Sequence, residues 1–147
     1  VARSNVCPEL DPPAEPGFFA FSYTVPDSGA APSFVVAGSA EAPEGKGDYR
    51  DNAIARGDVS PEGIRTKARW VLAEMENRMR ALGFDWRAAT ATQAYTVHDI
   101  HPFLGDELVR QGAMRNGITW HYNRPPVLGL EYEMDCRGVA LERVLAA

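Results

Sequence analysis

The sequence is poor in cysteine and contains no long apolar run. Cys7 and Cys136 are its only cysteines, so it has neither a disulfide framework nor a zinc-type CxxC pair. No run of about 18 apolar residues occurs, and the first residues lack the apolar core of a signal peptide. These absences predict a cytoplasmic protein. The first residue, Val1, is equally compatible with loss of an initiator, a trimmed chain and processing from a longer precursor.

Basic residues are scarce relative to acidic ones. Fifteen Lys and Arg residues stand against twenty Asp and Glu residues, which gives a formal charge of -5 at pH 7. This balance disfavours a broad nucleic-acid footprint and an anionic membrane surface, while it is compatible with a small basic pocket. The glycines match no phosphate-binding fingerprint, and no serine stands in a GxSxG motif. The sequence therefore predicts a small-molecule ligand, no cofactor, and neither a nucleic-acid nor a membrane partner.

The residues that are present suffice for one folded domain. A chain of 147 residues can bury roughly two thirds of its unfolded surface. Residues 1–17 contain four prolines and are predicted to be an extended lead segment, because proline fixes φ and disfavours helix at the preceding residue. Residues 18–147 are predicted to form a single domain.

The first part of this domain is predicted to be a β-hairpin followed by a loop. Phe18–Val25 and Phe34–Ala40 are short runs of aromatic, β-branched and small residues, and Pro26–Gly29 between them is rich in turn formers. Residues 41–59 are polar and without a useful period. A loop of this length in a compact domain is often functional or mobile.

The clearest predicted element is a helix that starts after Ser60 and stops at Gly83. Ser60 is a favourable N-cap, and Pro61 is well suited to the first helical position. Apolar residues then recur within about 100° of arc, as expected for one buried stripe; they are Ile64, Ala68, Val71, Leu72, Met75, Met79 and Leu82. Trp70 falls opposite this stripe, where it predicts either a subunit contact or a ring lying on neighbouring aliphatic stems.

The rest of the chain is predicted to alternate strand and helix before two closing strands. Residues 89–97 favour a strand, and residues 102–115 favour a helix that Gly105 and Gly112 weaken. Val127–Asp135 and Val139–Ala147 are predicted as strands joined by a turn at Cys136–Gly138. The predicted order is β-β-α-β-α-β-β, which makes an α+β domain with two helices over one mixed sheet.

Several local sequences resemble the RidA family, also called YjgF or UK114. The resemblance covers about three quarters of the chain and rests on the order and spacing of several soft motifs. These are Phe34-Val-Val-Ala-Gly-Ser39, Arg65-Thr-Lys-Ala-Arg-Trp-Val-Leu-Ala-Glu-Met-Glu76, Ala81-Leu-Gly-Phe-Asp-Trp86, Ala91-Thr-Gln-Ala-Tyr-Thr-Val-His-Asp-Ile-His-Pro-Phe103 and Arg124-Pro-Pro-Val127. The resemblance implies a chorismate-mutase-like fold that assembles as a homotrimer, with a ligand cleft between neighbouring subunits.

The resemblance also implies site residues, one of which is missing. In the best-known branch an arginine after the Arg-Pro pair clamps a substrate carboxylate, and a glutamate on the last strand positions water. The glutamate is carried over to Glu142, whereas the arginine position is Val127 and a nearby position is Gly129. Valine offers no bidentate fork for a carboxylate. Arg124, three residues earlier, reaches the cleft only if a loop reverses its face.

Aromatic, imidazole and guanidinium groups are concentrated just before the closing strands. His121, between Trp120 and Tyr122, is a candidate acid or base in a ring-lined pocket. The alternative is a strand that buries both rings and exposes His121. Phe19 and Gly38 complete the predicted substrate-binding set with Trp120, Tyr122, Arg124, Val127 and Gly129.

Glutamates on the closing strands have two interpretations. Glu142, on an apolar run, is predicted either to be a buried acid or base that activates water or to form a salt bridge with an arginine. Glu131 and Glu133 lie two apart, so they share one face of a strand. That face is predicted to be solvated or to lie between subunits.

The remaining histidines do not make a convincing metal site. His98 and His101 are spaced like i, i+3 ligands, but about three convergent ligands are required. Hydrogen bonding that secures the turn before Pro102 is the preferred interpretation, and no metal is predicted.

Two functions follow from these residues. The first is a trimeric RidA-type enzyme that hydrolyses or tautomerises an enamine, an imine or a related unsaturated metabolite, with Glu142 and His121 as catalytic residues. The second is a non-catalytic ligand-binding module on the same fold, which Val127 favours. Ribonuclease activity is disfavoured by the acidic balance.

Overall fold

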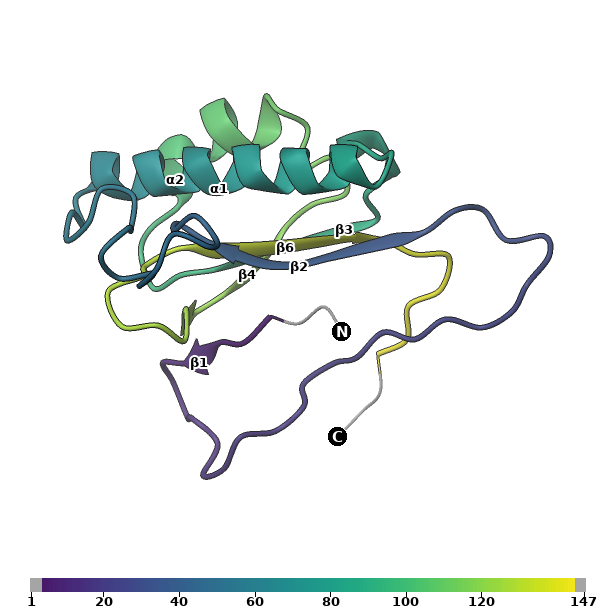
Figure 1. Cartoon of the computed structure of the whole chain (residues 1–147), viewed down its shortest axis with the longest axis horizontal. Coiled ribbons are helices and arrows are strands. Elements are labelled where there is room, and N and C mark those ends of the chain that lie inside the picture. Colours follow the sequence, from purple (N-terminus) through teal and green to yellow (C-terminus); the bar gives the residue numbers. More distant parts are fainter. Residues whose placement is uncertain (1–3, 145–147) are drawn as a thin grey trace.

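The computed structural model describes residues 4–144 and consists of one mixed sheet with helices on one face. The four strands lie in the order β2-β6-β3-β4, with β2 spanning Phe34–Ala40, β6 Glu133–Gly138, β3 Ala91–Tyr95 and β4 Thr119–His121. β6 is antiparallel to both neighbours, whereas β3 and β4 are parallel. The helices cover one face, and the segment before β2 runs along the other (Figure 1). The predicted α+β fold class with a mixed sheet is confirmed.

Helix α1, Pro61–Ala81, forms as the sequence predicts. The hydroxyl of Ser60 accepts a hydrogen bond from the backbone N–H of Gly63, which satisfies one of the free donors of the first turn. The predicted stripe from Ile64 to Met79 is buried against the sheet. Leu82 is the exception, because it follows the last helical turn and is 55% exposed. Trp70 is partly buried and packs against the core, which favours the intramolecular interpretation of this ring.

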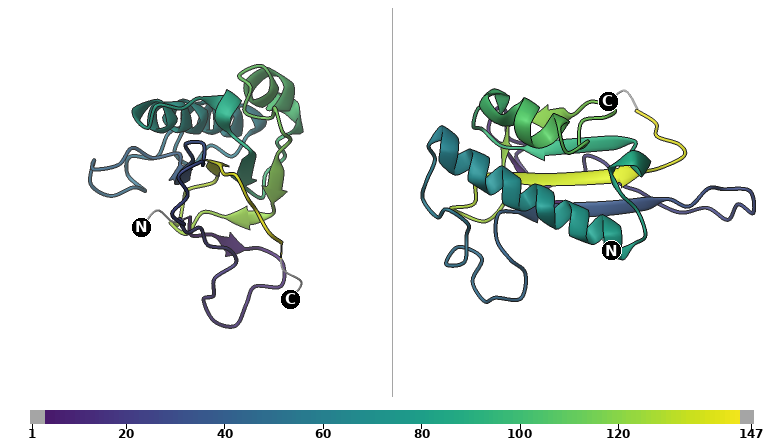
Figure 2. Two further views of the ribbon diagram at one scale, coloured as in Figure 1. Left: turned by 90° about the vertical axis from the view of Figure 1, so that its right-hand side faces the viewer. Right: turned by 90° about the horizontal axis from the view of Figure 1, so that it is seen from above.

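The second helical segment is shorter and less regular than predicted. It comprises α2, His101–Phe103, followed by a π-helical stretch, η2, over Leu104–Val109. The N–H of Arg110 bonds the carbonyl of Gly105, five residues back, as is characteristic of a π-helix. Gly112 then adopts a positive φ of 88° and ends the segment before the predicted limit. Helix α1 and this second helical segment lie over the same face of the sheet (Figure 2).

The predicted closing strands are wrong in their boundaries. A single strand, β6, runs through the expected turn at 136–138, while residues 127–132 are irregular and residues 139–144 form no strand. The last three residues of the predicted strand lie outside the described residues. Gly138 is required for packing, because a Cβ there would lie 2.4 Å from the carbonyl oxygen of Ala88 and 2.5 Å from the ring of Phe34.

The predicted hairpin is also wrong. Phe34–Ala40 is the edge strand β2, but residues 18–25 are extended without a strand partner in the described chain. The aromatic and β-branched composition of 18–25 predicted a strand, yet no neighbouring edge takes up its backbone groups.

Short elements that the sequence did not predict complete the chain. β1, Cys7–Pro8, pairs with β5, Asn123–Arg124, and attaches the lead segment beneath the sheet. A 3-10 turn, η1, spans Trp86–Ala88. The observed order of the main layer is therefore β-α-β-α-β-β, with β1 and β5 as a separate two-stranded sheet.

A buried ion pair connects the segment after β2 with helix α1, and its carboxylate also binds the segment just before β6. The ammonium of Lys67 lies 3.2 Å from Glu41, and both side chains are fully buried. The Glu41 carboxylate also accepts the backbone N–H groups of Glu131 and Tyr132, at 2.6 and 3.0 Å. Such a pair tolerates burial only because these additional bonds satisfy the carboxylate. None of the helices within residues 4–144 has the length and apolarity needed to cross a membrane.

Candidate active site

Alternation along three strands gathers ionisable groups on the sheet face opposite the helices, which we call the outer face. Ala94, Met134 and Cys136 point into the helical core. Their neighbours therefore point the other way. In the strand register Tyr95 is paired with both Glu133 and His121, so these three form one row across β6, β3 and β4. Gln93 and Asp135 are paired in the next row.

Glu133 has the most perturbed environment of the outer face. It is 5% exposed, and no side-chain or backbone donor in residues 4–144 bonds its carboxylate. Burial, followed by the nearby carboxylates of Asp135 and Glu41, raises the pKa of Glu133 to about 8. Its carboxyl group is therefore mostly protonated at pH 7. A buried acid with a raised pKa is a candidate for a functional site.

Asp135 is the hydrogen-bonding centre of the outer face. Its carboxylate accepts the hydroxyl of Tyr95 at 2.7 Å, the side-chain amide of Gln93 at 2.9 Å and the hydroxyl of Ser4 at 3.1 Å. Arg137 lies 3.9 Å away on the same strand. Burial and the charge of Asp135 raise the pKa of Tyr95, so its hydroxyl stays protonated and donates to Asp135.

His121 stacks on the ring of Tyr95 and has the exposed ring of Phe19 nearby. Its ring stacks on Tyr95 with 4.9 Å between centroids and 14° between planes, and Phe19 approaches edge-on at 6.0 Å. His121 Nε2 lies 2.8 Å from the side-chain oxygen of Gln93. Burial lowers the pKa of His121, and Arg137 acts in the same direction, while Asp135 opposes them. The imidazole is therefore neutral at pH 7 and can accept a proton.

Glu142 does not occupy the buried strand position that the sequence predicted. It lies on the irregular segment after β6 with a 48% exposed side chain, where it pairs with the guanidinium of Arg137 at 2.5 Å. Hydrogen bonding by Arg137 lowers the pKa of Glu142. The salt-bridge alternative is thus the observed one. The last strand of the sheet is β6, and the glutamate on that strand is Glu133.

Arg124 is engaged in ion pairs. Its guanidinium lies 2.8 Å from Glu9 and 3.3 Å from Glu131, so it is not free to clamp a ligand in this conformation. Glu131 also lies 2.8 Å from His98 Nε2. The face of Glu131 and Glu133 was predicted to be solvated or to lie between subunits. Glu133 is buried within the single chain, so the solvated alternative is wrong for this residue, and the intersubunit alternative stays a prediction.

The other predicted binding residues are dispersed. Trp120 packs on the core and donates to the carbonyl of Thr96, whereas Tyr122 is 48% exposed. The alternative that a strand buries both rings therefore holds for Trp120 but not for Tyr122. Val127 and Gly129 lie in the loop before β6, and the carbonyl of Gly38 accepts from Arg78. Among the predicted residues, the structure brings together only Phe19 and His121.

Histidines outside the outer face have structural partners. His101 bonds Asp99 through its side chain and its backbone N–H, at the turn before Pro102. His98 is bonded to Glu131 on the neighbouring segment. No group of three or more metal-ligating side chains converges within residues 4–144.

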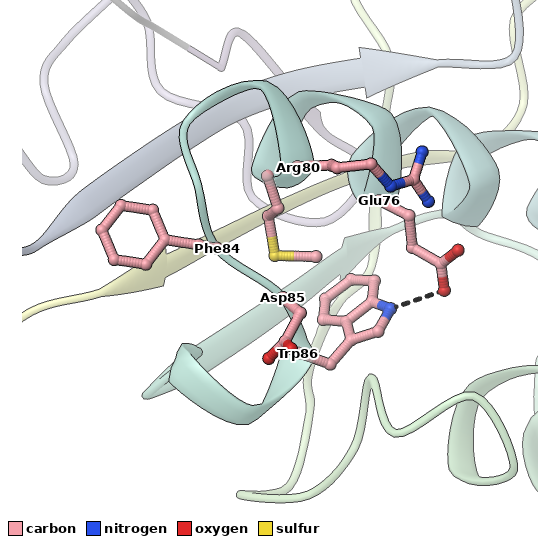
Figure 3. Close-up of a pocket in the computed structure, with 6 residues that line it drawn as sticks. Glu76, Arg80, Phe84, Asp85 and Trp86 are labelled. Carbon is pink, nitrogen blue, oxygen red and sulfur yellow. Dashed lines mark hydrogen bonds between the residues drawn. The ribbon is translucent and has the colours of Figure 1, made fainter.

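A hollow at the end of α1 is a weaker candidate. It has a volume of about 180 Å³ and is lined by Glu76, Met79, Arg80, Phe84, Asp85 and Trp86 (Figure 3). The Glu76 carboxylate already accepts the indole N–H of Trp86 at 2.9 Å. Because this carboxylate is already engaged, the outer face is the stronger candidate site.

Sequence reasoning missed Gln93, Tyr95, Glu133 and Asp135 as site residues. A signal was present in Glu133–Gly138, where acidic or basic residues alternate with apolar or small ones as on a strand with one polar face. The misplaced strand boundary concealed it. No signal in the sequence indicated that this polar face is buried.

Known proteins resemble this chain in sequence and in fold. Residues 1–143 match the family described as 2-aminomuconate deaminase CnbZ. A 2-amino-5-chloromuconate deaminase of Comamonas testosteroni is 52% identical over 147 residues. That match covers 99% of this chain and 59% of the relative, so the chain spans about three fifths of the relative's length.

Solved structures confirm the fold. A Rid-family protein of unknown function, YyfB from Yersinia pestis, superposes with a TM-score of 0.54 at 13% identity, covering 74% of this chain and 78% of the other. A putative endoribonuclease L-PSP from Entamoeba histolytica gives 0.52 at 16% identity, covering 94% and 96%. At these identities the likeness concerns the fold alone.

Proposed function

The chain belongs to the 2-aminomuconate deaminase CnbZ family and has the Rid fold, and on this premise we propose that it is a deaminase that hydrolyses a 2-aminomuconate-type enamine. The observation that carries the proposal is the row formed by Glu133, Tyr95 and His121. In this row a carboxyl group with a raised pKa faces the same side of the sheet as an imidazole with a lowered pKa. Environments that separate two pKa values in this way provide an acid and a base at one pH.

The substrate class comes from the activities for which the family and the relative are named. A muconate is a six-carbon conjugated dicarboxylate, and its 2-amino derivative is an enamine. Hydrolysis protonates a chain carbon, which converts the enamine to an imine. Water then adds to the carbon that bears nitrogen, and loss of ammonia leaves a carbonyl group. One water is consumed, one ammonia is released, and no oxidant or reductant is needed.

Glu133 and His121 supply the proton transfers in this scheme. Protonated Glu133 donates to the chain carbon, while neutral His121 accepts a proton from the attacking water. The resulting imidazolium gives that proton to the departing nitrogen. Glu133 recovers its proton from the carbinol hydroxyl as the C=O bond forms. Both residues thereby return to their starting states.

The non-catalytic alternative has one supporting observation. Val127 lacks the guanidinium of the family clamp, and Arg124 is already paired with two glutamates. A module of this kind would bind the dicarboxylate without releasing ammonia.

Ammonia release from freshly generated 2-aminomuconate separates the two functions. We expect release above the uncatalysed rate, and Glu133→Gln is expected to lower kcat by about 100-fold or more. Glu62→Gln, an exposed change on the opposite layer, is the control and is expected to keep the wild-type rate. Binding without release would support the module instead. Loss of activity in Glu142→Gln but not in Glu133→Gln would return the catalytic role to Glu142.

We further propose self-association, as a homotrimer with a cleft between subunits. The supporting observation is an apolar arm, residues 18–25, whose large side chains are Phe18, Phe19, Phe21, Tyr23 and Val25, exposed by 98, 92, 78, 77 and 68%. Four aromatic rings can bury roughly 600–1,000 Å² in total. A standard interface needs about 800 Å² per partner, so this arm can supply most of one partner's share.

A cytoplasmic location is part of the same proposal. Both cysteines carry free thiols, with Cys7 exposed and Cys136 buried. Free thiols of this kind are typical of reducing compartments, which supports the location.

A further inference from the structure

The side chain of Gln93 bridges His121 and Asp135 on the outer face. We propose that Gln93 is a positioning residue that fixes the tautomer of His121 and leaves Nδ1 as the proton acceptor of the reaction. The catalytic part of this role rests on the proposed deaminase function, whereas control of the His121 tautomer by Gln93 does not depend on activity.

The orientation of the Gln93 amide follows from its partner on β6. The Asp135 carboxylate already accepts from Tyr95 and Ser4, and as an anion it offers no donor. The amide nitrogen of Gln93 therefore faces Asp135, where it donates at 2.9 Å. The opposite orientation would place two acceptor oxygens against each other.

This orientation determines the protonation of the imidazole. With its nitrogen on Asp135, Gln93 presents its oxygen to His121 Nε2 at 2.8 Å. Nε2 must then carry the hydrogen, and in a neutral imidazole the lone pair is on Nδ1. No group in residues 4–144 bonds Nδ1, so it is available to a water or a substrate.

The same contacts restrict the ring's orientation. Tyr95 covers one face of the imidazole, and Phe19 approaches its edge. The charged groups that act on His121 are Asp135 and Arg137 of β6, and Arg137 is partly neutralised by Glu142. The titratable neighbour on β3 is Tyr95. Because Gln93 is the only hydrogen-bond partner of the His121 imidazole within residues 4–144, a change at Gln93 should alter the tautomer without removing the imidazole.

Nitrogen NMR of the histidine rings tests the tautomer directly. The chain has three histidines, so His98 and His101 act as internal references, and a His121→Gln variant assigns the third signal. We expect His121 of the wild type to be the Nε2–H tautomer. In Gln93→Leu we expect a mixture of tautomers, with unfolding followed by circular dichroism as the check on folding. An Nδ1–H tautomer in the wild type, or an unchanged tautomer in Gln93→Leu, would overturn the proposal.

Kinetics separate positioning from a purely structural role. Gln93→Leu is expected to lower kcat by about tenfold or more with little change in KM, because the base is misoriented while the substrate contacts remain. Gln93→Glu places a negatively charged carboxylate beside Nε2, which should raise the pKa of His121. The acidic limb of the pH–rate profile is therefore expected to shift to higher pH. A positioning role would be contradicted if Gln93→Leu changed KM as much as kcat and Gln93→Glu left the acidic limb of the pH–rate profile in place.

The outcomes also distinguish this inference from the proposed function. A wild-type protein that releases no ammonia contradicts the deaminase function and, with it, the catalytic half of the Gln93 role. The NMR comparison of wild type and Gln93→Leu still decides whether Gln93 sets the tautomer.

Discussion

Glu133 and His121 lie on one face of the sheet, separated by a single strand, because both are in register with Tyr95. Their strands, β6 and β4, therefore lie about 10 Å apart across β3. Tyr95 lies between the two side chains on this face and stacks on His121. The two side chains are therefore expected to act on different atoms of an extended, unsaturated ligand.

The pH–rate profile should be bell-shaped, since the active form has Glu133 protonated and His121 neutral. Activity is expected to fall as the pH rises through about 8, where Glu133 loses its proton. It is also expected to fall on the acidic side at a pH below 6.5, because the pKa of His121 is lowered from that value. Initial rates of ammonia release between pH 5 and pH 9 would measure both limbs. A profile that is flat through pH 8 would rule out Glu133 as the acid.

Glu133→Gln should be more stable than the wild type at alkaline pH. The pKa of Glu133 is raised from 4.5 to about 8 in the folded state. Its contribution to the free energy of unfolding is therefore fully present below pH 4.5 and is lost as the pH rises to about 8. The neutral amide avoids this penalty, which is at most about 5 kcal/mol. Urea unfolding should show little difference near pH 4.5 and a gain of a few kcal/mol at pH 8.5. Equal stabilities at both pH values would show that Glu133 is solvated in the folded protein.

Serine substitutions at Phe18, Phe21 and Tyr23 should dissociate the oligomer. These side chains are more than three-quarters exposed in one chain, so their removal costs the single chain little folding free energy. Light scattering should give a trimer mass for the wild type and a smaller mass for the triple variant. Serine at Val59, which is 52% exposed outside the arm, is the matched control. A monomeric wild type would remove the shared-cleft proposal.

Gly138→Ala should destabilise the fold because its methyl group has no space. The ideal Cβ position lies 2.4 Å from the carbonyl oxygen of Ala88, which is a backbone atom that cannot move alone. Overpacking of this kind typically costs about 1–3 kcal/mol. Gly105→Ala is the control, because nothing lies within 4 Å of its Cβ position. Thermal unfolding of the two variants should therefore differ, and similar midpoints would indicate that β6 is not packed as described.

Local signals were sufficient for some elements and insufficient for others. Helix α1 was predicted correctly because Ser60, Pro61 and the apolar period all lie within the helix or next to it. The prediction for the second helix was too long, because Gly112 adopts a positive φ and the N–H of Arg110 bonds a carbonyl five residues back instead of four. Neither feature follows from helix propensity. The prediction of a strand over Phe18–Val25 was wrong because a strand must pair with the edge of another strand, and local composition does not show whether such an edge is nearby.

Local signals also failed to identify most of the candidate site. His121 was identified from its aromatic neighbours, but Glu133 looked like its neighbour Glu131, and Glu142 was preferred because of its apolar surroundings in the sequence. The register of β6 against β3 reversed this choice. It placed Glu133 beside Asp135 and Tyr95, and it left Glu142 on an exposed segment with Arg137.

The sequence by itself determined the α+β class, helix α1, the β2 and β3 strands, the resemblance to the Rid fold and the interest of His121. These follow from periodicity, capping and short motifs, which act over neighbouring residues. Only the tertiary structure decided which glutamate is the acid and which groups hold His121. The pKa of a carboxyl group depends on the water it loses and on charges brought close by other strands. For Glu133 those charges belong to Asp135 and to Glu41, which is 92 residues earlier in the chain.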